Sequence, residues 1–316
     1  MTHQTAIVTY TGTTEHRAAR WSDASPDERK RRALEAASSR DTAELWSLTE
    51  THLYLTGASG AHVSPHTLTS YRAGVRLYVT WCGSAGVTIA RASADQGRAF
   101  VRWLEGRFAS ASVRARLAAA RQLYAALRWS GATTAAPFAD CKPARDLTAA
   151  HEKRAPFSPE ELGGVLAVAD PLERAFLLAG AHAGCRISEA LELRWSDING
   201  HTLRVRSGKG RKARTVELSA SLTAALAAIR PSSPGDERVF PFRQHAGRQR
   251  LAKLCRRAGV EQRCYHALRH HAGVLVYRAT GDLNEVAEHL GHSSVETARV
   301  YVHHTHARLR ELFASL

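Results

Sequence analysis

Two imidazoles, a guanidinium and a phenol lie close together near the carboxyl end of the chain. His266 and Arg269 are three residues apart at the start of an apolar run, so on the expected helix they share one face. A second helical repeat ends at Gly291, which suits the left-handed residue that terminates a helix. His292 then stands at a helix-to-helix corner, and Tyr301 follows nine residues later in a further short helix.

Two upstream basic residues extend this set. Arg186 follows Gly184 closely, where the plain alternative is a hydrogen bond to the end of a helix. Lys209 lies in the glycine-rich turn between two runs of alternating apolar and polar residues, 202–206 and 214–218, which predict a β-hairpin. The chain has 44 basic residues, of which only six are lysine, so a lysine retained at this turn calls for a reason. Lys212 is a rival for the same role and otherwise a candidate DNA contact.

The chemistry open to this set is phosphoryl transfer. Arg186 and Arg269 can clamp the non-bridging oxygens of one phosphate and neutralise its developing charge. The hydroxyl of Tyr301 can attack phosphorus once a base removes its proton. Lys209 can protonate a leaving 5′-oxygen near neutral pH, which an arginine cannot do. The product, a 3′-phosphotyrosine, keeps the energy of the phosphodiester, so rejoining needs neither ATP nor a metal.

Composition agrees with a polyanionic partner. The formal charge is +15, which predicts binding to nucleic acid first and to an anionic membrane surface second. No apolar run reaches the roughly 20 residues that span a bilayer, and no secretory signal is apparent. The five cysteines lack any CxxC pair and indicate reduced, cytoplasmic thiols. No cofactor is expected: there is no Walker A loop, and His303, His304 and His306 lack carboxylate or cysteine partners with metal-ligand spacing.

The pattern along the chain predicts two domains. Residues 1–40 are polar and basic and indicate a mostly disordered arm, with at most a helical turn near 27–37. Successive capping signals and apolar stripes over 41–131 predict a helical domain. The proline-containing, aperiodic segment 132–157 is the expected linker, and 158–316 the second domain, mainly helical with the small sheet.

One expected helix of the first domain carries a basic stripe. Arg114, Arg121 and Arg128 recur every seven residues beside the apolar face. The alternative is an ordinary solvated face, but the charge of the chain favours contact with DNA phosphates.

These residues resemble the conserved boxes of the tyrosine site-specific recombinases, the phage integrase family, and most closely its Xer branch. The resemblance covers roughly residues 41–316. The segment 183–189 looks like the first-arginine motif, 208–212 like the hairpin-lysine motif, and 266–270 like the His-x-x-Arg box. Leu290-Gly291-His292-Ser293 and Tyr301 match the remaining boxes.

The resemblance implies a two-domain, C-shaped clamp on double-stranded DNA, with an N-terminal SAM-like core-binding domain and a C-terminal catalytic domain. It implies Tyr301 as nucleophile, His266 as general base, Lys209 as general acid and His292 as a phosphate-stabilising group, while His270 supports the site. It further implies a tetramer on two duplexes. The C-terminal helix 306–316 is then donated to a neighbouring protomer, unless it packs on its own domain.

Several biological roles fit such an enzyme. Xer-like resolution of chromosome or plasmid dimers in the cytoplasm is the first, with a second recombinase or an activating DNA translocase as possible partners. Mobile-element integration and type IB topoisomerase-like activity use the same chemistry. A protein of a different class, a catalytically silent DNA-binding regulator, is the remaining alternative, although the complete residue set argues against it.

Overall fold

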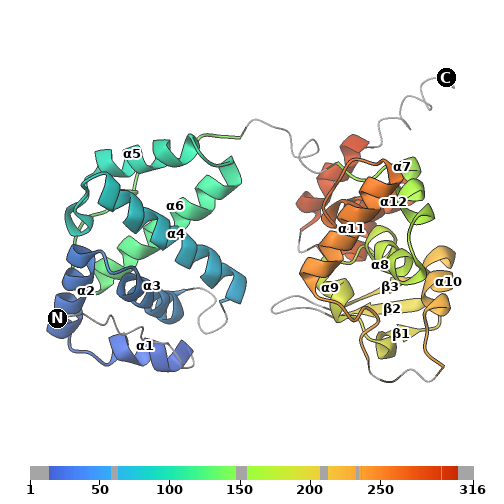
Figure 1. Cartoon of the computed structure of the whole chain (residues 1–316), viewed down its shortest axis with the longest axis horizontal. Helices are drawn as coiled ribbons and strands as arrows, with labels where there is room; N and C mark the ends of the chain where they lie inside the picture. The colour runs from blue at the N-terminus through green and yellow to red at the C-terminus, as the bar shows by residue number, and fades with distance from the viewer. Residues whose placement is uncertain are drawn as a thin grey trace. The chain divides into compact units, whose positions relative to one another are not determined.

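The polypeptide forms two compact units, residues 1–147 and residues 148–316. A computed structural model describes residues 14–57, 63–146, 155–206, 213–232, 235, 237–292 and 294–304. Helices make up the described part of the first unit, and the second combines helices with one small sheet at its edge (Figure 1). The prediction of a mainly α-helical protein with a small sheet in its second domain is confirmed.

The first unit is built on two long helices that cross closely. The helices of the unit are α1 (Thr14–Ser22), α2 (Pro26–Ser39), α3 (Thr42–Thr56), α4 (Pro65–Ser84), α5 (Ala94–Glu105) and α6 (Ser110–Trp129). A Cβ at Gly74 of α4 would lie only 2.5 Å from the Cβ of Ala119 of α6, so the glycine permits this approach. The predicted caps Asp41, Ser64 and Ser93 each accept a first-turn amide hydrogen bond.

Aromatic side chains fill the centre of this unit. The hydroxyls of Tyr78 and Tyr124 are 2.8 Å apart, and Tyr124 donates to the carbonyl of Ile89 at 2.8 Å. Because Tyr124 uses its one proton on Ile89, Tyr78 is the donor between the two hydroxyls. Phe100 and Phe138 pack edge-on against Tyr78. The buried polar atoms here are neutral and paired with one another.

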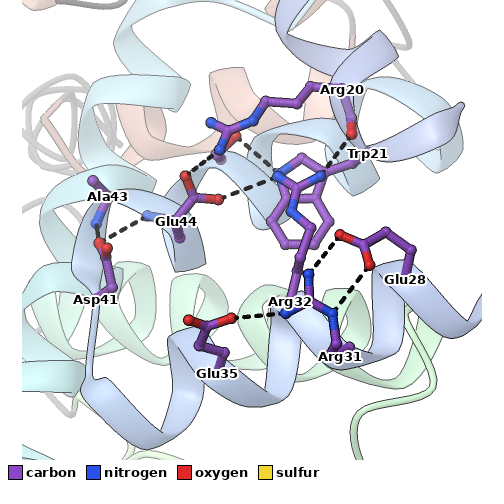
Figure 2. Close-up of polar contacts among 10 residues, drawn as sticks. Arg20, Trp21, Glu28, Arg31, Arg32, Glu35, Asp41, Ala43 and Glu44 are labelled. Carbon is purple, nitrogen blue, oxygen red and sulfur yellow. Dashed lines mark hydrogen bonds and ion pairs between the residues drawn. The ribbon is translucent and has the colours of Figure 1, made fainter. Parts of the chain in front are cut away.

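The prediction of a disordered arm is wrong for residues 14–39, which form α1 and α2. Trp21 is fully buried, and its indole Nε1 donates to Ser47 of α3 at 3.0 Å. Arg32 of α2 lies over the Trp21 ring at 4.2 Å, and Arg20 pairs with Glu44 at 2.8 Å, contacts visible in Figure 2. These contacts tie the two amino-terminal helices to α3.

The sequence pattern missed these helices because their buried face is small. Ala33, Ala36 and Ala37 form the buried stripe of α2, and alanine contributes little to a hydropathy pattern. One large residue, Trp21, provides most of the buried surface of α1. As a result α3 is covered on several sides: α1 and α2 pack against it as well as α4 and α6.

The expected linker 132–157 is also shorter than predicted on the described residues. Phe138 and Cys141 are buried in the core of the first unit, while Phe157 is buried in the core of the second. Arg121 of α6 holds the chain after the helix by donating to the carbonyls of Phe138 at 3.2 Å and Cys141 at 2.5 Å. The segment up to Cys141 therefore belongs to the first unit.

The second unit holds nine helical segments among the described residues, one of them the short 3-10 turn η4 (Trp195–Asp197) before the sheet. The others are α7 (Pro159–Ala167), α8 (Pro171–Ala181), α9 (Ile187–Glu192), α10 (Ala220–Ala228), α11 (Gln244–Ala258), α12 (His266–Thr280), α13 (Leu283–Leu290) and the 3-10 segment η5 (Val295–His304). Helix α8 is central, and α12 and α10 pack on it. Tyr265, at the start of α12, donates to the carbonyl of Phe176 in α8 at 2.7 Å. This bond sets the position of the helix that carries the His-x-x-Arg box.

The predicted hairpin is confirmed. Strands β1 (Ile198–Asn199), β2 (Thr202–Val205) and β3 (Arg214–Glu217) form an antiparallel sheet in that order, with Leu203 opposite Val216. The turn between β2 and β3, with Lys209 and Lys212, lies outside the described residues, as does the segment 306–316. A single antiparallel bridge between Arg194 and Arg238 lies outside these strands.

Candidate active site

Arg269 is the most deeply buried charge of the second unit. Its side chain is fully enclosed, with Nη1 donating to the carbonyl of Gly184 at 2.6 Å and Nη2 donating to the carbonyl of Leu290. Burial lowers the pKa of Arg269 to about 10, and the neighbouring charges of Arg186 and Arg214 act in the same direction. The guanidinium thus connects the turn before Arg186 to the end of α13.

Arg186 caps the short helix α9. Its backbone N–H donates to Glu189 at 2.9 Å, and its Nη1 donates to the same carboxylate at 2.5 Å. The preceding turn needs Gly184, which has φ +62° and whose absent Cβ would lie 2.5 Å from Leu290. The side chain of Arg186 stays 24% exposed, so it is available to an incoming phosphate.

Glu189 and Arg214 complete this cluster, and the sequence prediction missed both. Arg214 of β3 donates to Glu189 at 3.0 Å, to the carbonyl of His289 at 2.9 Å and to that of Gly184 at 3.3 Å. Burial by itself raises the pKa of Glu189, but the hydrogen bond and charge of Arg214, followed by bonds from Arg186, bring it down to about 2. Three guanidiniums therefore share one carboxylate, with Arg269 at 3.7 Å from it, and net positive charge remains.

A sequence signal for these two residues does exist. Arg214 alternates with Val216 on the inward face of β3, so it is an arginine at a position expected to be apolar. Glu189 follows Arg186 with the three-residue spacing of a capping box. The alternating pattern predicted the strand that contains Arg214, but it did not predict which groups the guanidinium of Arg214 contacts.

His292 stands at the predicted corner. Helix α13 ends at Gly291 in the left-handed region with φ +63°, and the N–H of His292 then donates to the carbonyl of Ala287 at 2.8 Å. Burial, and then the charges of Arg269 and Arg186, lower the pKa of His292 to about 4. Its ring is therefore neutral at physiological pH, and Nδ1 is buried with no hydrogen-bond partner in the described part of the chain.

Tyr301 is buried rather than exposed to solvent. It lies in η5, a 3-10 segment, with only 1% of its surface exposed, and its hydroxyl is 3.0 Å from Nδ1 of His270. The phenol ring lies on Gly273 of α12, where a Cβ would come within 2.5 Å of the ring. The ring of His292 runs nearly parallel to it, with centroids 6.4 Å apart.

Five of the six predicted catalytic residues come together. The charges of Arg186, Arg269 and His266 all act on His292, and that of Tyr301 acts on Arg269. The structure therefore brings together Arg186, His266, Arg269, His292 and Tyr301. Lys209 lies in the turn outside the described residues.

The predicted DNA-binding arginines belong to the first unit. Arg114, Arg121 and Arg128 are exposed on α6, as the stripe predicts. Two of them also bind backbone of the following segment: Arg121 as described above, and Arg128 through the carbonyl of Ala135 at 3.0 Å. Arg114 donates to Ser110 within its own helix at 2.8 Å. Arg121 and Arg128 therefore hold residues 135–141 in place, and this role competes with contact to a DNA phosphate.

The sequence prediction also missed a basic helix of the second unit. Helix α11 carries no acidic residue, and several of its basic side chains are exposed. The exposed ones are His245, Arg248, Lys253, Arg256 and Arg257. The buried stripe of the same helix is Gly247, Leu251, Leu254 and Cys255, so the outer face is free for a polyanion.

Neither a metal centre nor a membrane span is found where the structure describes the chain. Residues 14–304, apart from the gaps given above, contain no group of three or more histidine, cysteine or acidic side chains arranged to hold a metal ion. No helix within these residues is long and apolar enough to cross a bilayer.

The site gathers the guanidiniums of Arg186, Arg214 and Arg269 in the same unit as a buried phenol. The description "Phage integrase family" matches residues 161–308, and "Phage integrase, N-terminal SAM-like domain" matches residues 54–131. The chain belongs to the phage integrase family, and within it to the tyrosine recombinases. Helices α1 and α2 precede both matched segments.

The curated relatives and solved structures agree with this membership. The chain is 32% identical to tyrosine recombinase XerC of Xanthomonas campestris over 267 residues, covering 76% of this chain and 79% of the relative. It is 31% identical to XerC of Pseudomonas aeruginosa, covering 78% and 86%. In fold it is similar to XerH bound to a palindromic difH substrate, with TM-score 0.64, 17% identity and 96% of each chain covered. A lambda integrase dimer bound to a core site gives TM-score 0.66 at 15% identity, covering 81% of this chain and 76% of that one.

Proposed function

We propose that this protein cleaves and rejoins DNA strands at a specific site through a covalent bond between Tyr301 and a 3′-phosphate. The supporting observation is that the phenol of Tyr301 is buried against Gly273 of α12, the helix that also carries Arg269. A nucleophile and its phosphate clamp are thus prepared before substrate arrives. Nearby charge assists binding of the phosphate and stabilises the transition state.

Each member of the cluster then has a role. Arg186 and Arg269 hold the non-bridging oxygens. His292, neutral and with a buried Nδ1 lacking a described partner, can share a hydrogen bond with the phosphate. His266 lies beside it and completes the polar wall of the site. Lys209, brought in on the hairpin, protonates the departing 5′-oxygen.

Double-stranded DNA is the substrate that the charge supports. The +15 net charge and the exposed basic side chains of α11 provide sequence-independent affinity. Arg114 and Lys212 would add contacts to the DNA backbone. Arg121 and Arg128 would add such contacts only as far as their hydrogen bonds to residues 135–141 allow. Such contacts position the duplex without themselves reading its sequence.

The biological role proposed first is resolution of chromosome or plasmid dimers in the cytoplasm, by a tetramer on two duplexes. The support is that its curated relatives carry the name XerC. A second recombinase or a DNA translocase as activator belongs to this role. Integration of a mobile element is the second candidate, because one of its structural neighbours is an integrase.

The test is formation of the covalent adduct on a nicked suicide duplex that carries the site recovered by footprinting of this protein on its own genome. Tyr301→Phe should abolish the adduct and leave duplex binding within about twofold, because a lost hydroxyl removes the nucleophile and not the charge. Tyr277→Phe is a matched control, because Tyr277 is a partly buried tyrosine packed in the same small core. An adduct that persists in Tyr301→Phe would remove this tyrosine from the mechanism.

Relaxation of a supercoiled plasmid that lacks the site would favour topoisomerase activity.

A further inference from the structure

One polar contact of Tyr301 was not expected. Its hydroxyl is 3.0 Å from Nδ1 of His270, the residue that follows Arg269 in the His-x-x-Arg box. Both side chains are buried, with 5% of His270 and 1% of Tyr301 exposed. A hydrogen bond removed from water is the arrangement in which a proton passes directly between its two atoms.

Helix α12 builds this contact with a three-residue spacing. His270 and Gly273 lie on one face of the helix, and the missing side chain of Gly273 leaves room for the phenol ring. With the ring resting on Gly273, the hydroxyl reaches the imidazole one turn back along α12. The pairing therefore depends on the helix that also carries Arg269, and phosphate clamp and proton acceptor share one rigid element.

The other imidazoles are less suited to accept this proton. His266 meets His270 edge to face, with ring centroids 4.6 Å apart and planes at 84°, so it borders the contact without replacing it. His292 lies with its ring parallel to that of Tyr301, with centroids 6.4 Å apart, and its buried Nδ1 bonds no group in the described residues. The charges of Arg269 and Arg186 beside it also make it a weak base.

We infer that His270, and not His266, accepts the proton of Tyr301 when the tyrosine attacks the scissile phosphate. In this step the bond from the tyrosine oxygen to phosphorus forms and the bond from phosphorus to the 5′-oxygen breaks. The proton of Tyr301 moves to Nδ1 of His270, giving an imidazolium, and the 5′-oxygen takes a proton from the general acid. In rejoining, the imidazolium returns its proton to the tyrosine oxygen. The inference rests on the proposed function.

Single-turnover cleavage of the suicide duplex by the full-length protein tests this assignment. His270→Ala and His270→Asn should each slow cleavage about 100-fold, the usual contribution of a general base. The asparagine amide can still hydrogen-bond the hydroxyl but cannot accept its proton. The matched control is His271→Asn, because His271 is the next residue, is equally buried at 5%, and bonds the carbonyl of Phe157 at 2.7 Å, away from the site.

The dependence on pH separates proton transfer from positioning. With an imidazole base, the cleavage rate should fall as pH drops through the range in which histidine ionises, and this limb should be lost in His270→Asn. If His270 only orients the phenol, His270→Asn would lower the cleavage rate without changing its dependence on pH. Wild-type cleavage rates in His270→Asn, or an unchanged profile, would overturn the inference.

The last experiment uses a more acidic phenol at position 301. Replacing Tyr301 by a fluorinated tyrosine lowers the cost of losing the proton, so the defect of His270→Asn should shrink to about tenfold or less. An undiminished defect would contradict proton transfer at this oxygen. These outcomes are separate from those of the proposed function: if Tyr301→Phe forms no adduct while the His270 variants cleave normally, recombination stands and only the base assignment fails.

Discussion

The polar groups at the centres of the two units are buried in opposite ways. In the first, the buried hydroxyls of Tyr78 and Tyr124 are neutral and end on the carbonyl of Ile89. In the second, Arg269 is fully buried as a cation, and Glu189 is held as an anion among arginines. Burying charge is costly unless it is paired, and removing one partner of such a cluster leaves the others uncompensated.

The difference separates a scaffold from a reaction site. A neutral network whose hydrogen bonds are satisfied internally stabilises one packing arrangement and has no charge with which to attract a ligand. The cluster of Arg186, Arg214, Arg269 and Glu189 carries three positive charges and one negative charge, so it still attracts an anion. Burial and neighbouring charges together shift the pKa values of Glu189 and Arg269 in this cluster. Three substitutions and one pH series test this contrast.

The largest effect is expected from Arg269→Lys. A lysine cannot bond both backbone carbonyls and a phosphate oxygen as the planar guanidinium can, so cleavage should fall about 1,000-fold, as when a transition-state donor is removed. Affinity for the duplex should change far less, because the remaining basic surface is intact. Cleavage kinetics beside a binding titration measure the two. Equal losses of rate and affinity would mean that Arg269 contributes only general attraction.

Arg214→Met should have the next largest effect. Without Arg214, Glu189 is free to draw Arg186 and Arg269 away from the phosphate, and a misplacement of about 1 Å costs on the order of 100-fold in rate. The matched control is Arg206→Met, since Arg206 forms a comparable ion pair with Asp197 at 2.6 Å outside the cluster. Should both variants cleave alike, Arg214 has no positioning role. Partial recovery in the double variant Arg214→Met with Glu189→Gln would support the mechanism.

Tyr124→Phe tests the neutral network of the first unit. It removes both hydrogen bonds of the Tyr124 hydroxyl, and leaves the carbonyl of Ile89 with the N–H of Ala92 and the hydroxyl of Tyr78 with Cys82. The loss should cost about 1 kcal/mol of unfolding free energy. Five of the six tryptophans lie in the first unit, so urea denaturation followed by tryptophan fluorescence reports on it. Cleavage by the bound complex should not change. A loss of cleavage rate at unaltered stability would show that the network serves the reaction.

The smallest effect is a loss of stability of the second unit in acid. The folded pKa of His292 is about 4 against 6.5 unperturbed, so the unfolded chain binds the proton more readily, and stability falls as pH drops from 6.5 towards 4. Glu189 acts in the same direction at lower pH, between 4.5 and about 2, because its folded carboxylate is stabilised. Hydrogen exchange of α12 and α13 against pH measures the trend. His292→Asn should flatten the upper part of the curve and Glu189→Gln the lower part, and curves identical to wild type would contradict these assignments.

Local patterns were sufficient for the elements and for most of the site. Capping residues such as Asp41 and Ser93 start their helices as predicted, because a cap acts within one turn. The terminating glycine before His292 behaves in the same way. Helices α1 and α2 escaped prediction because an alanine face and one tryptophan become a core only when α3 covers them.

The sequence by itself determined the types and order of the reactive groups and the turns that present them, since those depend on neighbours along the chain. Only the tertiary structure decided that Arg214, from a strand, shares the carboxylate of Glu189, and that the phenol of Tyr301 meets His270. These pairings join segments 25 and 31 residues apart, and no periodicity encodes such a distance. They arise because α12 packs on α8 and η5 packs on α12, and packing fixes which buried polar groups must satisfy one another.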